Sequence, residues 1–128
     1  MNDILKPHEK LIGHTFKYKQ IIVIRKDVEM SPAKLAVQVA HGSIESFQRT
    51  DPCVRDEWYM EGMKKVVLMV QSLEELQELN KNVPHGTFII DFGLTELAPN
   101  TITGLAFNIM NINEVPKPLK KLKLYGLI

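Results

Sequence analysis

The segment 31-SPAKLAVQVAHGSIESF-47 carries the signals of a helix around which the rest of the chain is organised. Ser31 is a helix-capping residue, and Pro32 suits the first helical position, where its missing N–H costs nothing. Apolar or small side chains recur at spacings of three and four, which predicts an inward face made of Leu35, Ala36, Val39, Ala40, Ser43 and Phe47. A polar row is predicted on the other side, made of Lys34, Gln38, His41 and Glu45.

This polar row has two interpretations. A cation, an amide and an imidazole beside a helix N-terminus form a surface that can receive an anionic substrate. The alternative is the ordinary solvated face of a surface helix, and the pattern by itself favours that alternative.

Four strands are predicted around this helix. The first is the β-branched run Gln20–Arg25, which is typical of a strand covered on both faces. The other three strands are predicted at residues 65–71, 87–91 and 102–110, and Gly104 indicates a bulge or a close backbone approach within the last. Ser72 and Glu75 form a capping box that begins a second helix. This alternation predicts a single-domain α/β layered fold.

Two segments are predicted to be irregular. Residues 1–17 lack periodicity and are predicted to be an irregular N-terminal extension that precedes a domain over residues 18–128. Arg49–Met63 is predicted to be a polar connection, with Pro52 and Gly62 as breakers. Glu114 is a candidate start of a last helix. Pro116 and Pro118 follow it, and proline is tolerated only in the first turn of a helix.

Composition excludes several classes of protein. The 128 residues are 45% hydrophobic and 24% charged, as in an average globular domain. The sequence has no apolar run long enough for a membrane span and no secretory signal, and Cys53 is its only cysteine. We therefore expect a cytoplasmic protein without an internal disulfide.

Charge is segregated along the chain, although the net charge is only +1. Residues 1–34 and 101–128 are each net basic, whereas residues 35–100 are net acidic. If the two ends meet in the fold, they form a basic surface that can contact phosphates.

Candidate chemistry lies where the third predicted strand ends. In α/β sheets ligands bind beyond the carboxyl ends of parallel strands, and Asp91 follows the run 87-TFII-90 there. Asp91 is a candidate base or a partner for Lys34 or His41, and capping of loop amides is the alternative. Hydroxyl groups nearby in the sequence belong to Thr95, Thr101 and Thr103. The sequence has no glycine-rich phosphate loop and no Cys/His cluster with metal-ligand spacing, so we expect no cofactor and no metal.

Six motifs in order indicate a family. They are the strand ending at Arg25 with DVEM after it, the helix motif KLAVQVAH, the segment WYMEGMKKVV, the motif DFGLTE, the turn PNTIT and the terminus KLKLY. In this order, from Tyr18 to Tyr125, they resemble the archaeal/eukaryotic-type (type 2) peptidyl-tRNA hydrolases. The resemblance implies a mixed four-stranded sheet flanked by helices, and frequently a homodimer. It also implies hydrolysis of the ester that joins a peptide to the 3′ end of tRNA, without a required metal.

The resemblance assigns roles to residues of the matched motifs. The expected catalytic residues are Lys34, Asp91, Thr101, Thr103 and His41, although helical rise places His41 about 10 Å from Lys34. The expected substrate-binding residues are Gln38, Arg25, Thr95 and Lys123.

The DFGLTE motif departs from the family's Asp-Ala-Gly-Arg-Thr-Gln. Leu94 replaces an Arg and Glu96 replaces a Gln, which removes a cation and adds a carboxylate near a phosphate-rich substrate. Phe92 replaces a small Ala, and its ring can stack on a terminal base. Asn100 replaces a turn Gly and is the mildest change, because Asn tolerates left-handed turns. Two alternatives stay open: a related protein that binds tRNA or a protein partner without this catalysis, and a hydrolase of another acyl ester or amide.

Overall fold

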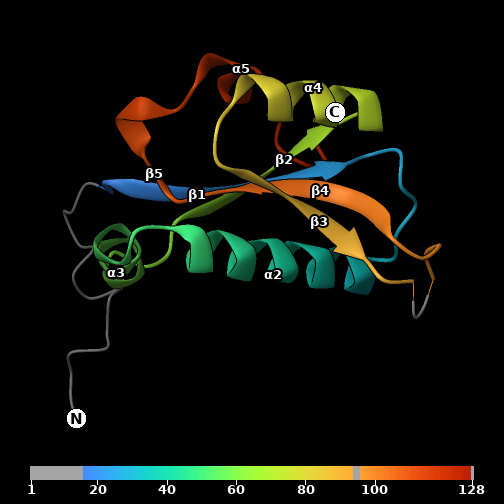
Figure 1. The fold of residues 1–128 in the computed structure, drawn as a ribbon, viewed down its shortest axis with the longest axis horizontal. Coiled ribbons are helices and arrows are strands. Elements are labelled where there is room, and N and C mark those ends of the chain that lie inside the picture. The colour runs from blue at the N-terminus through green and yellow to red at the C-terminus, as the bar shows by residue number, and fades with distance from the viewer. Residues whose placement is uncertain (1–15, 94–95, 128) are drawn as a thin grey trace, which may run out of the picture.

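The computed structural model describes residues 16–93 and 96–127, which form a five-stranded mixed sheet between two layers of helices (Figure 1). The elements follow in the order β1 (Tyr18–Arg25), α2 (Pro32–Arg49), α3 (Pro52–Met60), β2 (Lys65–Val70), α4 (Leu73–Asn82), β3 (Gly86–Asp91), β4 (Thr101–Phe107), β5 (Met110–Asn111), the 3-10 helix η2 (Ile112–Glu114) and α5 (Lys117–Lys120). Helices α2 and α3 cover one face of the sheet, and α4 and α5 cover the other.

The sheet has the strand order β2-β1-β4-β3, with β5 paired to the start of β1. β1 and β2 are parallel, and β4 is antiparallel to both β1 and β3. The carboxyl ends of β1, β2 and β3 therefore meet at one end of the sheet. The prediction of a mixed four-stranded sheet is confirmed, with the short β5 in addition, because the predicted strand over residues 102–110 is divided between β4 and β5.

β1 is buried on both faces, as its apolar run predicts. Ile21 and Val23 join the core beneath α4 and α5, which also includes Leu76 and Leu119. Ile22 and Ile24 join a second cluster, against which Leu35 and Val39 of α2 pack. The central strand thus ties the two helical layers to one sheet.

Gly104 marks both a close approach and a bulge. A Cβ atom on Gly104 would lie 2.3 Å from the Val23 carbonyl oxygen, so only glycine fits at this point of β4. In the β3–β4 ladder Ile89 pairs with Gly104 and Ile90 pairs with Ile102, which leaves Thr103 as an extra residue of β4. An extra residue changes which face of the sheet a side chain points to, and Thr103 lies on the α2 side.

The prediction that Arg49–Met63 is a polar connection is wrong, because most of this segment is helix α3. The Asp51 carboxylate accepts the Cys53 N–H at 2.9 Å, and Pro52 begins the helix instead of breaking it. Trp58 is buried and donates its indole N–H to the Lys64 carbonyl at 2.7 Å. This bond attaches α3 to the start of β2.

The predicted facing of α2 is wrong in part. The buried residues of this helix are Gln38, Gly42 and Ser46, and Lys34 is half-buried on the same side, whereas Ala36 and Ala40 are exposed. A periodicity argument counts polar side chains as outward, but here the sheet supplies polar partners to the inward face. Gly42 supports the close packing, since a Cβ there would lie 2.7 Å from the Ile89 Cδ1 atom.

The two edges of the sheet differ. Residues 123–125 run along β2, where the Met69 N–H donates to the Lys123 carbonyl and the Tyr125 N–H donates to the Val67 carbonyl. Among the described residues, no strand pairs with the outer side of β3. One edge is therefore closed by the chain itself.

The predicted extension over residues 1–17 lies almost wholly outside the described residues, and its irregularity stays a prediction. Phe16 and Lys17 are described, and the Glu61 carboxylate accepts the Lys17 N–H at 3.2 Å. In the described part of the chain, no helix combines the length and apolarity that a membrane crossing requires.

Candidate active site

A buried polar cluster lies where β3 ends and α2 begins. Asp91 is the last residue of β3, Lys34 and Gln38 come from the first two turns of α2, and Thr103 is the extra residue of β4. Figure 1 shows the carboxyl end of β3 beside the first turn of α2. All four residues belong to the motifs matched in the sequence, and the structure brings them together.

Lys34 and Asp91 form an ion pair that is largely removed from water. The Lys34 Nζ atom lies 2.6 Å from Asp91 Oδ1, and the side chains are 10% and 6% exposed. Asp91 Oδ2 accepts the Gly93 N–H at 2.8 Å. The hydrogen bond from Lys34 holds the pKa of the Asp91 carboxyl below its ordinary value, although burial opposes this shift. Asp91 is therefore an ionised carboxylate at neutral pH.

Gln38 connects this ion pair to β4. Its Nε2 atom donates to Asp91 Oδ1 at 3.0 Å, and its Oε1 atom accepts the Thr103 hydroxyl at 2.7 Å. Both Gln38 and Thr103 are completely buried. Because both ends of the Gln38 amide are hydrogen-bonded, this amide fixes the position of the Asp91 carboxylate on its buried side.

The start of α2 is bonded to Glu96. Ser31 caps the helix by accepting the Lys34 N–H at 3.1 Å. Its own N–H and hydroxyl donate to the two oxygens of Glu96, each at 2.8 Å, and these bonds lower the pKa of that carboxyl. The contact between Ser31 and Glu96 was not predicted from the sequence. The one sequence signal at this position is that Glu96 replaces the family's Gln in the DFGLTE motif, and this replacement does not indicate a partner.

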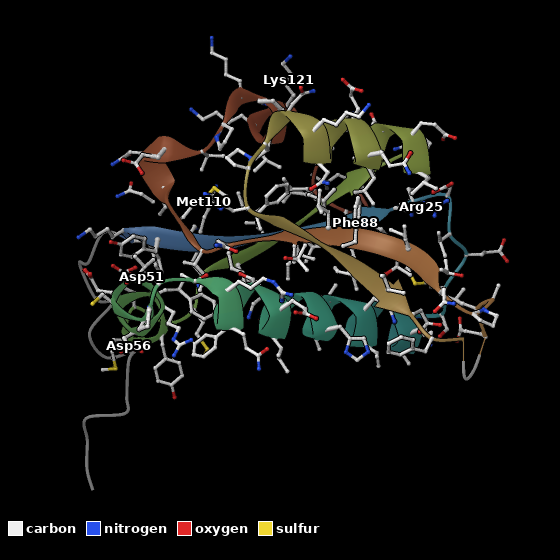
Figure 2. The ribbon with its side chains drawn as sticks, viewed as in Figure 1. Arg25, Asp51, Asp56, Phe88, Met110 and Lys121 are labelled. Atoms are coloured by element: carbon white, nitrogen blue, oxygen red, sulfur yellow. The ribbon has the colours of Figure 1, made fainter. Side chains whose placement is uncertain are left out.

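Two hollows border α2, one at its start beside Lys34 and one farther along the helix beside β3. One, of about 280 Å³, is lined by Ser31, Ala33, Lys34, Val37 and Glu96. The other, of about 380 Å³, lies between α2 and β3, and it includes Phe92, the residue after Asp91. A larger hollow of about 450 Å³ lies around Met110 and Tyr18 and is remote from the cluster. Figure 2 labels Met110 and Arg25 toward opposite ends of the sheet.

Two predicted catalytic residues are not bonded to the cluster. Thr101 pairs with Asp91 across the ladder, but its hydroxyl donates to the Ala98 carbonyl at 2.6 Å. His41 is exposed and lines the hollow beside Phe92.

Apart from Gln38, the predicted substrate-binding residues lie outside the cluster or outside the described residues. Arg25 donates to both oxygens of Asp27 and to the Ile102 carbonyl, so its guanidinium joins the end of β1 to the start of β4. Lys123 lies beyond β2, roughly 20 Å from β3 at four strand spacings. Thr95 lies outside the described residues.

Within residues 16–93 and 96–127, no three His, Cys, Asp or Glu side chains are grouped as metal ligands would be. The chemical groups at the cluster are an ammonium, a carboxylate, an amide and a hydroxyl. A carboxylate can take a proton from water, and an ammonium can stabilise an oxyanion, so the arrangement suits acyl transfer to water.

We predict that the Asp91→Asn variant loses stability in a pH-dependent way. Removing one partner of a buried ion pair costs roughly 3–5 kcal/mol at neutral pH. Because folding lowers the pKa of Asp91, its contribution is complete above the unfolded-state pKa and disappears as pH falls through the lower folded value. The urea unfolding free energies of wild type and variant should therefore converge as pH falls below 3.8, the ordinary pKa of an aspartate. Asp56→Asn, at an exposed site, should change little at any pH. A difference between wild type and the Asp91→Asn variant that stays constant across this range would contradict the prediction.

Comparison with known proteins places this site in a family. The family model described as peptidyl-tRNA hydrolase PTH2 matches residues 18–125. A peptidyl-tRNA hydrolase of Thermococcus onnurineus is 44% identical over 98 residues, covering 71% of this chain and 83% of the relative. Proteins of the same name from Methanopyrus kandleri and Methanothermobacter thermautotrophicus are 42% and 36% identical, covering 78% and 83% of this chain and 91% and 98% of the relatives. The chain belongs to the PTH2 family of peptidyl-tRNA hydrolases.

Proposed function

We propose that this chain hydrolyses peptidyl-tRNA, releasing the peptide and free tRNA by direct attack of water. The observation that carries this proposal is the buried Lys34–Asp91 pair, held by Gln38 beside a surface hollow that Lys34 itself lines. The names of the relatives agree with this activity.

The proposed reaction uses the two charges in different ways. Asp91 orients the water and takes its proton as the water oxygen bonds to the ester carbonyl carbon. Lys34 carries three N–H donors and stabilises the negative charge that develops on the carbonyl oxygen. The bond from that carbon to the ribose oxygen then breaks, and the proton passes to the ribose oxygen. The products are a free ribose hydroxyl and a peptide carboxylic acid, which releases its proton to solvent and becomes the carboxylate.

The buried amide and hydroxyl act as positioning groups in this proposal. Gln38 and Thr103 hold Asp91 from the core and do not reach the substrate. Thr101 and Arg25 order the start of β4, while His41 and Phe92 line the neighbouring hollow. Thr95 keeps its expected binding role on the resemblance alone.

Recognition of tRNA is supported by two groups of basic residues, in which lysines from both ends of the chain are joined by Lys64. Burial lowers the pKa of Lys19, and the nearby charges of Lys64 and Lys120 lower it further, so these three lysines lie close together. At the other end of the sheet the Lys26 ammonium lies over the Tyr125 ring, 4.7 Å from its centre, and Lys123 precedes Tyr125 by two residues. A phosphate backbone that follows the sheet would contact both groups.

We expect Lys34→Ala and Asp91→Asn each to lower kcat about 10²- to 10⁴-fold on peptidyl-tRNA, because each removes a charge used in the transition state. The measurement is release of a labelled peptide at saturating substrate, with aminoacyl-tRNA as a second substrate. The control Lys121→Ala, on the opposite helical layer, should leave kcat unchanged. Wild-type turnover by both variants would refute the assignment. Binding of tRNA by wild type without turnover would indicate a tRNA-binding protein instead.

We expect Glu96→Gln to lower KM for peptidyl-tRNA several-fold and to leave kcat nearly unchanged. The amide oxygen can still accept a hydrogen bond from Ser31, while the negative charge near the substrate phosphates disappears. The difference in KM should shrink as salt is raised, because the lost repulsion is screened. An unchanged KM at low salt would show that this carboxylate does not oppose the substrate.

We also propose a homodimer, acting in the cytoplasm. The dimer is supported by the resemblance and by the exposed side chains of Tyr59 and Met63, on a segment whose Trp58 completes the core of one chain. The cytoplasm is supported by a lone, exposed Cys53. Sedimentation equilibrium should give twice the mass of one chain, and Met63→Lys should shift the protein toward the monomer. A single-chain mass for wild type at every concentration would refute the dimer.

A further inference from the structure

The hollow of about 380 Å³ between α2 and β3 has an apolar floor with a polar rim. Its apolar side chains are the exposed Ile44, Ile90 and Phe92, with the half-buried Phe88 and the buried Ile89, and Phe92 has 73% of its surface in contact with solvent. Its rim comes from one face of α2, where His41, Glu45 and Gln48 follow one another at helical spacing. Glu45 is engaged by Arg49, so its charge is paired.

Phe92 contributes little to the fold of the described residues. An aromatic ring that remains three-quarters exposed buries almost no apolar area, so folding gains little from it. Phe92 directly follows Asp91, and adjacent Cα atoms lie about 3.8 Å apart, so the two side chains leave the backbone at neighbouring points at the end of β3. An exposed ring next to a reactive group is suited to contact with a ligand.

We propose that this hollow binds the 3′-terminal adenine of the tRNA, with the base stacked on Phe92. The inference rests on the proposed function and adds a subsite to it. The scissile ester and the terminal base are attached to the same ribose, so a base must lie within one sugar of Asp91 during reaction. Of the two hollows that border α2, the one at Ser31 contains the Glu96 carboxylate and no aromatic ring. The Phe92 hollow provides the π surface that a purine requires.

His41 gains a role in this arrangement. It lies on α2 at the rim of the hollow, where it can form a hydrogen bond with the edge of the stacked base. Its imidazole supplies a donor at one nitrogen and an acceptor at the other, which suits the amino group and the ring nitrogens of adenine. A contact with the base instead of with the ester agrees with the position of His41, about 10 Å from Lys34 along the helix.

The test compares two substrates that differ only in the terminal base. One is an N-acetyl-aminoacyl-tRNA that ends in adenosine, and the other carries the same ester on a terminal ribose without a base. For wild type, loss of the base should raise KM about five- to hundredfold, the fold-change that corresponds to one stacked base. For Phe92→Ala the KM for the complete substrate should rise by a similar factor, and the two substrates should become nearly equal.

Controls separate stacking from structure. Phe92→Leu keeps an apolar side chain without a π surface and should lie between wild type and Phe92→Ala. Leu127→Ala, at another exposed apolar position, should keep the wild-type ratio. Urea unfolding midpoints of all variants should agree with wild type, because none removes a buried group.

The outcomes distinguish this subsite from the proposed function. Equal KM values for the two substrates with wild type, together with normal turnover, would overturn the adenine subsite and leave hydrolysis intact. If the rise in KM caused by Phe92→Ala depends on the amino-acid side chain of the substrate instead of on the terminal base, the hollow binds the peptide, and the proposal is also overturned. If neither substrate is hydrolysed, calorimetric titration with the trinucleotide CCA and its form without the terminal base decides. Tighter binding of complete CCA by wild type alone would support the subsite, and equal binding would overturn it.

Discussion

The buried contact between Lys34 and Asp91 is the constraint on which the arrangement of this site depends. Two charges taken out of water are stable only when they lie close together and their remaining hydrogen-bonding groups are satisfied. Here Gln38 and the Gly93 N–H satisfy the carboxylate, and Thr103 satisfies Gln38. This requirement fixes the rotation of α2, because its inward face must present a lysine and a glutamine. The reactive groups are therefore held by the fold itself.

The bulge in β4 is the second part of this arrangement. An ordinary ladder would place successive residues on opposite faces, but Thr103 and Gly104 both face α2. The glycine allows β4 to approach β1, and the threonine reaches the helix. The local irregularity of the strand thus provides support for the Asp91 carboxylate.

Local sequence signals predicted the helices and strands well, but they predicted less well how these elements pack against one another. The run Gln20–Arg25 predicts a doubly covered strand because burial on both faces leaves a continuous apolar sequence. Ser31 and Ser72 predict helix starts because capping acts within one turn. Pro52, in contrast, has the same local signature as a breaker and as a first helical residue, so its presence did not predict α3.

The facing of α2 and the contact between Ser31 and Glu96 depend on residues more than fifty positions apart. Periodicity within the helix carries no information about polar partners that the sheet provides. Ordered motifs supplied what periodicity could not, since they grouped Lys34, Gln38, Asp91 and Thr103 before any geometry was known. They did not separate groups that meet the ion pair from those, such as Thr101 and His41, that lie around it.

The unequal edges of the sheet limit how copies of this chain can associate through backbone hydrogen bonds. Residues 123–125 already occupy the edge of β2, whereas β3 presents the other. Fibre growth by strand addition needs two available edges on every molecule, one to join and one to extend. In residues 16–93 and 96–127 only the β3 edge is available, so such an association between these parts of two chains ends after a single partner. The segment that closes β2 therefore protects the folded protein against open-ended aggregation, independently of anything that happens at Asp91.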